Sequence, residues 1–313
     1  MTKPAPTAMP LPRVAVLLAT YNGADYLPEQ LESLRTQRDV AITLHARDDG
    51  STDTTCAILR QTAAIWPELK GAQPQPNLGA AYSFLQLLQT APDDAGYYAF
   101  CDQDDVWLPD KLARAAAALS TDEGPALYCS NLTCVARDLT VIGVPAAHRD
   151  ERFLHILFEN IATGCTIVLN AKARALINSK TPLTGLVMHD WWCALVVAAL
   201  GRIHYDPEPT LLYRQHGANS VGQDPTWLSQ SARNLKRFLR QPRSCYPIHA
   251  QAAELLRLFG SRMPAPARAD LEALVASKRG WHARVAYALS GKVVRRRVLN
   301  AVFVRALILA GWY

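Results

Sequence analysis

The sequence predicts an α/β fold in which a mostly parallel central sheet is flanked by helices and followed by a helical extension. Three observations lead to this prediction. Over the first half of the chain, short apolar runs typical of buried strands alternate with segments of helical spacing. The apolar runs end in polar loops, as strands do at the ligand-binding edge of such a sheet. From residue 226 onward the pattern is helical and rich in arginine.

The first two strands are predicted from uninterrupted or nearly uninterrupted apolar runs. Residues 14–19, "VAVLLA", read as a buried parallel strand, and 41–46, "AITLHA", as the next. The turn "TYNGADY" leads from the first strand into a helix over 27–37, and "RDDGSTD" leads from the second into a helix over 54–66. Each strand is therefore followed by a polar loop and then by a helix.

The same alternation continues to about residue 119. The loop "NLG" at 77–79 enters a helix over 80–89, the strand "YYAFC" spans 97–101, and a helix over 109–119 follows the acidic cluster. Three strand ends then carry the polar loops "TYNG", "DDGSTD" and "DQDD". Because such ends meet at one edge of the sheet, we expect them to form a site.

The second half of the sequence is less regular. Strands are predicted at 126–135, at 165–170 and around 202–206, with helices at 171–179 and 189–201. The segment "PTLLYRQHGANSVG" follows the last of these strands. We find no internal repeat.

Composition excludes several classes of protein. No apolar run reaches the eighteen or so residues of a transmembrane helix, and the proline-rich residues 1–12 lack the apolar core of a signal peptide, so we expect a disordered lead-in. The cysteines form no C-x-x-C pair and several lie in apolar runs, which indicates buried free thiols rather than disulfides. The sequence also lacks a P-loop, a G-x-G-x-x-G turn, an H-E-x-x-H motif and a G-x-S-x-G elbow.

The net charge of +6 conceals an asymmetry. From residue 231 onward there are sixteen Lys and Arg against three Asp and Glu, whereas the first 230 residues carry a net charge of −7. Basic segments with apolar residues at helical spacing suit an anionic membrane surface. A solvated outer face on helices that pack against the first part of the chain explains the pattern equally well. No recognition motif supports nucleic-acid binding.

The stretch "FCDQDDVW" places Asp102, Asp104 and Asp105 within four positions. One acidic residue there would suit the N-terminus of the helix that follows, where carboxylates favour the helix dipole. Three adjacent carboxylates repel one another unless a positive group lies among them. Their oxygens at a strand end suit Mg²⁺ or Mn²⁺ bound together with a phosphate.

Four motifs together resemble family 2 glycosyltransferases of the GT-A nucleotide-diphospho-sugar transferase fold. These are "LLATYNG", "RDDGSTD", "NLGAAYSF" and "FCDQDDVWLPDKL", which have the order and spacing of that family. Downstream, "HDWW" and "YRQHGANSVG" are similar to the subset of bacterial rhamnosyltransferases of surface-polysaccharide pathways. The resemblance covers roughly residues 13–222. It implies a catalytic domain over 13–225 and a basic helical region over 226–313.

The resemblance also implies roles for the residues of the first three loops. Asp104 and Asp102 match the metal-binding acids of the family, Asp105 would support them, and His216 lies where some members supply a third metal ligand; alternatively, His216 is structural. Asp53 is expected to cap the following helix. The nucleotide-sugar pocket would be formed by Thr20, Tyr21, Asn22, Asp49, Asn77, Gly79, Asp102 and Gln103.

Asp190 matches the catalytic base of the family. Many members have Glu-Asp where this chain has His189 and Asp190, a difference that leaves the base in place. The alternative is that Asp190 caps the helix that begins there. His189, Trp191 and Trp192 are expected on the acceptor side, where aromatic rings stack on sugars, although one of the two tryptophans is expected to belong to the core.

The resemblance therefore implies an inverting transferase that uses Mg²⁺ or Mn²⁺ and a nucleotide-diphosphate sugar donor. L-Rhamnose from dTDP-rhamnose is the expected donor sugar, with galactosyl, glucosyl or N-acetylhexosaminyl transfer from a UDP-sugar as alternatives. The acceptor would be a lipid-linked glycan of O-antigen type. The enzyme would work in the cytoplasm, in peripheral contact with the inner membrane through its basic helices. A nucleotide-sugar-binding scaffold without turnover is the alternative outside the enzyme class.

Overall fold

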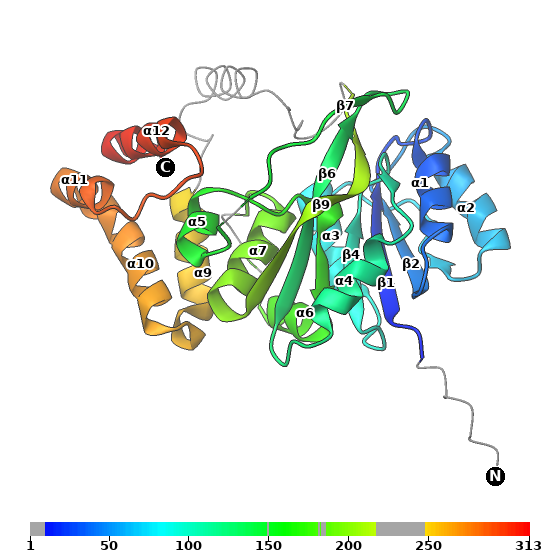
Figure 1. Ribbon diagram of the computed structural model, residues 1–313, viewed down its shortest axis with the longest axis horizontal. Coiled ribbons are helices and arrows are strands. Elements are labelled where there is room, and N and C mark those ends of the chain that lie inside the picture. Colours follow the sequence, from blue (N-terminus) through cyan, green and yellow to red (C-terminus); the bar gives the residue numbers. More distant parts are fainter. Residues whose placement is uncertain (1–9, 149, 181, 183–185, 217–247) are drawn as a thin grey trace, which may run out of the picture.

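The computed structural model describes residues 10–148, 150–180, 182, 186–216 and 248–313. Most of the expected lead-in and the segment 217–247 lie outside these ranges. The described strands form one sheet in the order β3-β2-β1-β4-β8-β6-β9-β5, and β7 pairs with β6. Figure 1 shows this sheet in the middle of the molecule with helices around it.

The first four strands of the sheet are parallel, as the alternating pattern predicts. β1 (Arg13–Thr20) pairs with β2 (Ala41–Asp48) and with β4 (Tyr97–Cys101), and β3 (Leu69–Lys70) extends the sheet beyond β2. The helices between these strands are α1 (Leu27–Arg35), α2 (Thr55–Ile65) and α3 (Ala80–Thr90).

Beyond β4 the sheet becomes mixed. β8 (Val168–Asn170) enters antiparallel between β4 and β6 (Ala126–Val135), and β5 (Val106–Trp107) pairs antiparallel with β9 (Arg202–Arg214). The remaining elements of this half are α4 (Lys111–Leu119), β7 (Val141–Gly143), α5 (Phe153–Phe158), α6 (Ala171–Asn178) and α7 (His189–Leu200).

Two of the predicted strands have other bounds in the structure, and the short strands β3, β5 and β7 were not predicted. The strand expected around 202–206 continues to Arg214, because β9 pairs in parallel with β6 across register shifts near Asn131 that accommodate its two prolines. The strand expected at 165–170 begins instead with a single 3₁₀ turn, Gly164–Thr166, which leaves β8 only three residues long. Both differences lie in the half where the sequence pattern is weaker.

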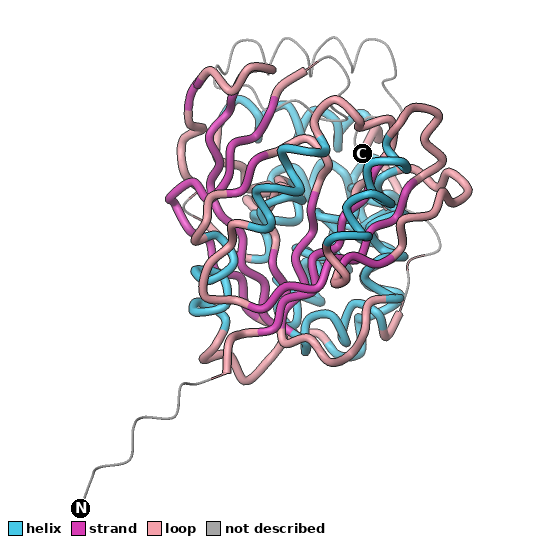
Figure 2. Tube along the Cα trace, turned by 90° about the vertical axis from the view of Figure 1, so that its right-hand side faces the viewer, coloured by secondary structure: helices cyan, strands magenta, loops and turns pink. Residues whose placement is uncertain are grey.

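The two faces of the sheet bury different residues. In β1, Val14, Val16 and Leu18 face the side covered by α1, α2 and α4, whereas Ala15 and Leu17 face the side covered by α3, α6 and α7. Strands covered on both faces need continuous apolar sequence, which explains the run "VAVLLA". Figure 2 shows the twisted strands with helices on both sides.

The chain ends in four helices that gather at one end of the molecule (Figure 1). Their inward-facing residues, such as Leu255, Leu271 and Ile308, belong to the same buried cluster as α7. The division into a catalytic domain and a basic helical region stays a prediction. The four helices are α9 (Ile248–Phe259), α10 (Ala265–Ala276), α11 (Trp281–Leu289) and α12 (Val298–Ala310).

Two predictions from composition are confirmed within the described ranges. The six cysteines there are free and buried. No helix that the structure describes has the length and apolar character needed to cross a bilayer.

Candidate functional site

Three polar loops meet at one edge of the sheet. β1 and β2 end in register, with Thr20 opposite Asp48, and β1 and β4 pair with Leu18 opposite Cys101. The loops that follow these strands therefore leave the sheet side by side, as the three polar strand ends in the sequence predict.

Gln103 connects the loop after β1 to the loop after β4. Tyr21 N donates a 2.8 Å hydrogen bond to Gln103 Oε1, and Gln103 Nε2 donates a 3.0 Å bond to the Tyr21 carbonyl. A side chain at Gly23 would collide with this amide, since an added Cβ would lie 2.0 Å from Gln103 Oε1. A larger residue in place of the glycine of "TYNG" would displace the Gln103 amide from its two hydrogen bonds with Tyr21.

Asn22 connects the loop after β1 to the loop after β2. It adopts a left-handed backbone conformation with φ 48°, which asparagine tolerates better than most residues. Its N–H donates to Ser51 Oγ at 2.8 Å, and its Oδ1 accepts from Thr52 N at 2.8 Å. Thr20 Oγ1 donates to Asp48 Oδ1 at 2.9 Å in the same region. Thr20 and Asn22 therefore fix the loops on which the pocket was predicted.

The Asp49 carboxylate is buried and makes its contacts with the chain itself. Two of these contacts, with Leu78 N and Gly79 N, hold the residues just before α3. In the same loop Asn77 Nδ2 donates to the Asp49 carbonyl at 2.9 Å. The direct contact with base or ribose expected for Asp49 would compete with these bonds. The carboxylate accepts four hydrogen bonds of 2.7–2.9 Å, from Arg47 Nη1, Leu78 N, Gly79 N and Ser83 Oγ.

The pairing of β5 with β9 brings His216 to the acidic cluster. His216 Nε2 lies 2.8 Å from Asp104 Oδ2 although the two residues are 112 positions apart. The Tyr26 ring stacks on the His216 ring with a centroid distance of 4.7 Å. Two of the three predicted metal ligands are therefore in direct contact.

Asp105 is fully buried beneath the cluster. Its Oδ1 accepts a 3.2 Å bond from Arg214 N, and the Cys165 thiol donates to the same carboxylate, while Oδ2 has no close hydrogen-bond partner in the described structure. Arg214 Nε also donates to the Asp104 carbonyl at 3.0 Å, so that β9 holds the loop. An oxygen of Asp102, one of Asp105 and Cys165 Sγ all lie within 4.8 Å of one another.

These carboxylates are held in an environment that disfavours their charge. Burial, followed by the charges of Asp104 and Asp190, raises the pKa of Asp102 to about 8. Burial and the same neighbouring acids, Asp104 and Asp102, raise the pKa of Asp105 well above its ordinary value. Lys111 is also buried, and burial lowers its pKa to about 8. A cation among the acids would relieve this repulsion.

Asp190 lies in the first turn of α7 and is buried. The N-cap of α7 is Met188, so Asp190 is not the capping residue that the alternative interpretation required. Its Oδ1 accepts a 2.6 Å bond from Trp191 N, and the Asn160 side chain and the Gly164 backbone donate to the same carboxylate. Burial nevertheless raises the pKa of Asp190 to about 6. A carboxylate with this pKa is a stronger base than an ordinary aspartate.

The structure removes two of the three residues expected on the acceptor side, and it identifies Trp192 as the tryptophan that belongs to the core. Trp192 is fully buried against Phe259, and His189 is buried between Phe84 and Phe100, with its ring 4.1 Å from the Phe84 ring. Neither can stack on a sugar, because both side chains fill the core behind α7. Trp191 is partly exposed, and its Nε1 donates to the Ile156 carbonyl at 2.6 Å.

The sequence interpretation missed three residues that hydrogen-bond to the predicted ones or to their loop, and a buried lysine beside the acidic cluster. Arg214, Asn160, Gly164 and Lys111 were assigned no role. Arg214 and Lys111 lie inside "YRQH" and "PDKL", parts of the family motifs, and this position could have drawn attention to them. Asn160 and Gly164 lie in "ENIATGCT", which belongs to none of the motifs, so the sequence did not indicate a role for them.

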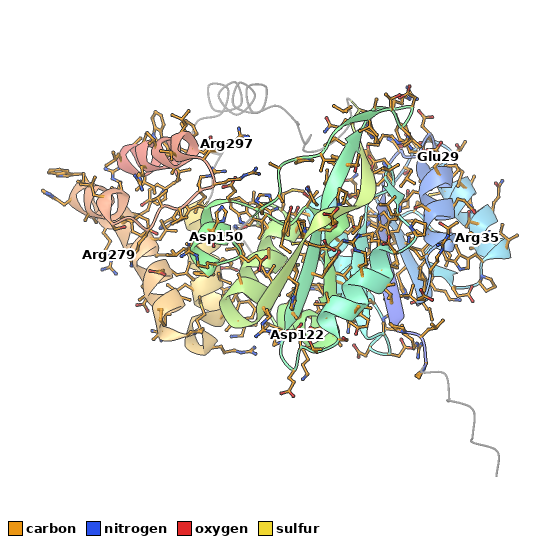
Figure 3. All side chains as sticks on the ribbon, viewed as in Figure 1. Glu29, Arg35, Asp122, Asp150, Arg279 and Arg297 are labelled. Atoms are coloured by element: carbon orange, nitrogen blue, oxygen red, sulfur yellow. The ribbon has the colours of Figure 1, made fainter. Side chains whose placement is uncertain are left out.

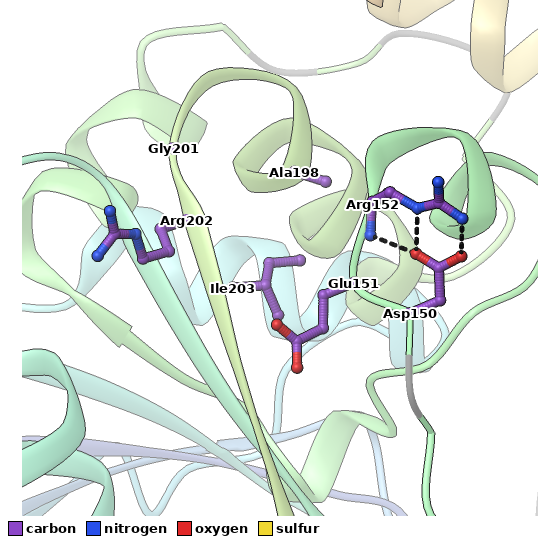
Figure 4. A pocket seen from close by; sticks show the side chains of 7 residues that line it. All are labelled: Asp150, Glu151, Arg152, Ala198, Gly201, Arg202 and Ile203. Carbon is purple, nitrogen blue, oxygen red and sulfur yellow. Dashed lines mark hydrogen bonds and ion pairs between the residues drawn. The ribbon is translucent and has the colours of Figure 1, made fainter.

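A wide cavity of ≈ 620 Å³ lies elsewhere on the molecule. Residues 150–152 and 201–203 line it, together with Ala198, and Figure 4 shows Arg152 held by Asp150 on one side with Arg202 on the other. None of the predicted site residues lines it. Its size alone therefore does not make it the site.

The family model of glycosyl transferase family 2 matches residues 15–154. The dTDP-rhamnosyl transferase RfbG of Shigella flexneri is 32% identical over 214 residues, which cover 66% of this chain and 73% of that protein. TuaG of Bacillus subtilis, named as a candidate teichuronic acid biosynthesis glycosyltransferase, is 34% identical over 166 residues, 50% of this chain and 62% of TuaG.

Solved structures share the fold at low sequence identity. TarS residues 1–349 of S. aureus in complex with UDP-GlcNAc has a TM-score of 0.61 and 17% identity, covering 95% of this chain and 81% of that one. The mannosyltransferase PcManGT of Pyrobaculum calidifontis, in complex with GDP-Man and Mn²⁺, has a TM-score of 0.54 and 19% identity, covering 99% and 84%. The predicted GT-A fold is thereby confirmed.

Proposed function

The chain belongs to glycosyltransferase family 2, and we propose that it transfers L-rhamnose from dTDP-rhamnose to a hydroxyl group of a glycan acceptor in bacterial surface-polysaccharide biosynthesis. Family membership makes the chain a glycosyltransferase with a nucleotide-sugar donor. The choice of rhamnose rests on the name of the Shigella relative, which is similar over two thirds of the chain.

One observation carries the enzymatic proposal. Asp102, Asp105 and Asp190 are carboxylates with raised pKa values, and Asp190 lies close enough to Asp102 for its charge to raise the pKa of Asp102. Keeping such groups charged and close is unfavourable for folding. Active sites are where this cost is commonly found, because the shifted groups take part in the reaction.

Asp190 is proposed as the general base. The acceptor hydroxyl loses its proton to the Asp190 carboxylate while its oxygen attacks the anomeric carbon of the donor sugar from the face opposite the diphosphate. The bond to the diphosphate breaks in the same step, so the anomeric configuration inverts. Asn160 and the Gly164 backbone orient the carboxylate through the hydrogen bonds they donate. A base of this kind typically contributes ~10²–10⁴-fold in rate.

The acidic cluster fits a divalent cation. Oxygens of Asp102 and Asp105 lie with Cys165 Sγ within 4.8 Å of one another, and Asp104 Oδ2 lies 2.8 Å from His216 Nε2, so that the cluster offers mainly hard oxygen atoms. Asp102, Asp104 and His216 are the proposed ligands, with Asp105 beneath them. When bound, Mg²⁺ or Mn²⁺ would neutralise charge on the departing diphosphate.

The nucleotide is proposed to lie over the loops that carry Thr20, Tyr21, Asn22, Asn77 and Gly79. Gln103 and Asp49 would act by holding these loops through the hydrogen bonds described above. Tyr21 is 50% exposed and is the aromatic ring in this group available to contact a base.

The acceptor is proposed to be a lipid-linked glycan, which places the enzyme in the cytoplasm at the inner membrane. Trp191, partly exposed beside Asp190, is the remaining candidate for stacking on the acceptor sugar. Transfer of a hexose or N-acetylhexosamine from a UDP-sugar is the second candidate. The TarS structure contains UDP-GlcNAc, but its 17% identity supports the fold alone.

Thermal unfolding of the purified chain with dTDP, UDP or GDP, each with and without Mn²⁺, tests the donor class. A ligand at a hundred times its Kd stabilises a fold by ~2.7 kcal/mol, so a metal-dependent shift with dTDP supports the proposal and a shift with UDP alone favours the second candidate. Turnover of dTDP-rhamnose, with the product anomer assigned by NMR, tests inversion. If the chain binds a nucleotide but turns over no donor with any acceptor, the result would favour a nucleotide-sugar-binding scaffold over an enzyme.

A further inference from the structure

α12 is apolar on both of its sides. Its inward side buries Ala301, Val304, Leu307 and Ile308 in the core. A surface helix normally carries polar residues on the opposite side. In α12 the sequence "VLNAVFVRALILA" provides Asn300 and Arg305 as its polar residues.

The outward side of α12 is an exposed apolar face. Val298, Leu299, Val302 and Leu309 are 78%, 73%, 52% and 46% exposed. Leu299, Val302 and Leu309 recur at helical spacing and so lie along one stripe. We define the apolar face as these four residues. The neighbouring helix α11 also carries exposed apolar side chains, Trp281 and Leu289, which are 61% and 79% exposed.

The charge around the apolar face is positive. In residues 248–313 there are eleven Lys and Arg and three Asp and Glu. All three acids are neutralised by neighbours, in the ion pairs Glu254–Arg257, Asp270–Lys292 and Glu272–Arg268. Arg279 and Arg297 are exposed, and Figure 3 shows them on the outside of the C-terminal helices near α11 and α12.

We propose that the apolar face is a membrane-docking surface for an anionic bilayer. α12 presents exposed aliphatic side chains, α11 presents an exposed tryptophan, and the three acids of residues 248–313 are all in ion pairs, which is the chemistry of an interfacial surface. α12 has 13 residues, about 20 Å of helix, which is too short to cross the hydrocarbon core. It therefore lies in the plane of the interface with Val298, Leu299, Val302 and Leu309 immersed.

This surface deepens the proposed function, on which its biological use rests, because a lipid-linked acceptor is presented at a membrane. In Figure 1 β1 runs upward from its N-terminal end, so its carboxyl end, at which the sheet edge of the candidate site lies, is toward the top of the view. α12 also lies toward the top. The docking helix and the carboxyl end of β1 therefore lie toward the same side of the molecule in this view.

Vesicle co-sedimentation of the full chain tests the proposal. We expect binding to phosphatidylcholine vesicles that contain phosphatidylglycerol, weaker binding at high salt, and little binding to pure phosphatidylcholine. Arg279→Ser with Arg297→Ser should weaken binding by about 25-fold, at ~1 kcal/mol for each basic residue. Leu299→Ser with Val302→Ser should weaken it by at least ~10-fold.

Matched controls lie at the other end of the molecule. Ile65 in α2 is 71% exposed, and Arg35 at the end of α1 is exposed and labelled in Figure 3. Ile65→Ser and Arg35→Ser should leave vesicle binding unchanged. Transfer to a short soluble acceptor should be unaffected in all these variants, so failure of docking and failure of the proposed reaction can be told apart.

Two outcomes would overturn the proposal. One is absence of binding to the anionic vesicles, or equal loss of binding in the control variants. The other is a change of oligomeric state in Leu299→Ser with Val302→Ser, measured by light scattering without lipid. That result would assign the apolar face to a second copy of the chain.

Discussion

The loop after β2 and the loop after β4 each carry three aspartates at the same edge of the sheet, yet their environments are opposite. In the first loop the carboxylates accept several hydrogen bonds from the chain itself. Burial acts to raise the pKa of Asp48 and of Asp53, but hydrogen bonds outweigh it and bring both pKa values below the ordinary value. Asp48 accepts from Ser51, Thr20 and Cys56. Asp53 accepts from Thr55 and Ala24. In the second loop burial and mutual repulsion raise the pKa of Asp102 and Asp105.

The difference shows how an acidic loop can be assigned a role. Carboxylates that accept hydrogen bonds from the chain stabilise the fold, as Asp49 does with its four donors. Carboxylates that are buried without enough donors destabilise the fold unless a ligand supplies positive charge. Asp190 belongs to the second kind, because its pKa is raised despite the hydrogen bonds it accepts.

The largest expected effect is on turnover in Asp190→Asn. Asparagine keeps the shape of the side chain but cannot take a proton, so kcat should fall by ~10²–10⁴-fold. Steady-state kinetics with the donor identified by thermal unfolding measure this. Nucleotide binding with metal should stay close to that of the wild type. A kcat within a few-fold of wild type would show that another group is the base.

A large loss of stability is expected in Asp49→Ala. The substitution leaves the buried Arg47 guanidinium without its carboxylate partner and removes the acceptor for Leu78 N and Gly79 N. Removing one partner of a buried ion pair costs about 3–5 kcal/mol, which urea unfolding can measure. If Asp49 acted mainly on the nucleotide, the variant would instead lose nucleotide affinity with its unfolding midpoint unchanged.

A smaller effect, on affinity, is expected in Asp104→Ala. Loss of a ligand should weaken metal-dependent nucleotide binding by at least ~10-fold, measured by calorimetry with and without Mn²⁺. Stability in the absence of metal should change little. Asp110→Ala is the matched control, since Asp110 flanks the same helix and its side chain is 58% exposed in a pair with Arg114. Equal losses in the two variants would return the cluster to a helix-flanking role.

The smallest expected effect is a pH-dependent gain of stability in Asp190→Asn. The pKa of Asp190 is about 6 in the folded chain against 3.8 ordinarily, so the folded state holds the proton more tightly. The wild type should therefore lose stability relative to the variant as pH rises from about 4 to about 6, and the difference should then level off. A gap of two pKa units corresponds to about 3 kcal/mol as an upper value.

Urea unfolding of the wild type and of Asp190→Asn across this pH range measures the difference between their free energies of unfolding. A wild type that stays as stable as the variant above pH 6 would mean that the donors from Trp191, Asn160 and Gly164 satisfy the carboxylate. Asp190 would then resemble the aspartates after β2 rather than those after β4.

The parallel half of the fold could be read from the sequence because its signals are local. An apolar run such as residues 14–19 must be covered on both faces, and a polar loop that follows it must lie at the edge of the sheet. The second half could not be read as well. β9 is one strand only because it pairs with β6, and the prolines within it indicate a break when taken alone.

The sequence by itself determined which acids gather at the edge, since Asp102, Asp104 and Asp105 follow a strand that has to be buried. Tertiary structure decided what each of them can do. His216 reaches Asp104 only through the pairing of β5 with β9, and Asn160 reaches Asp190 only through the packing of α5 against α7. The number of donors around a carboxylate depends on residues far away in the chain, and that number sets its charge, its pKa and its role.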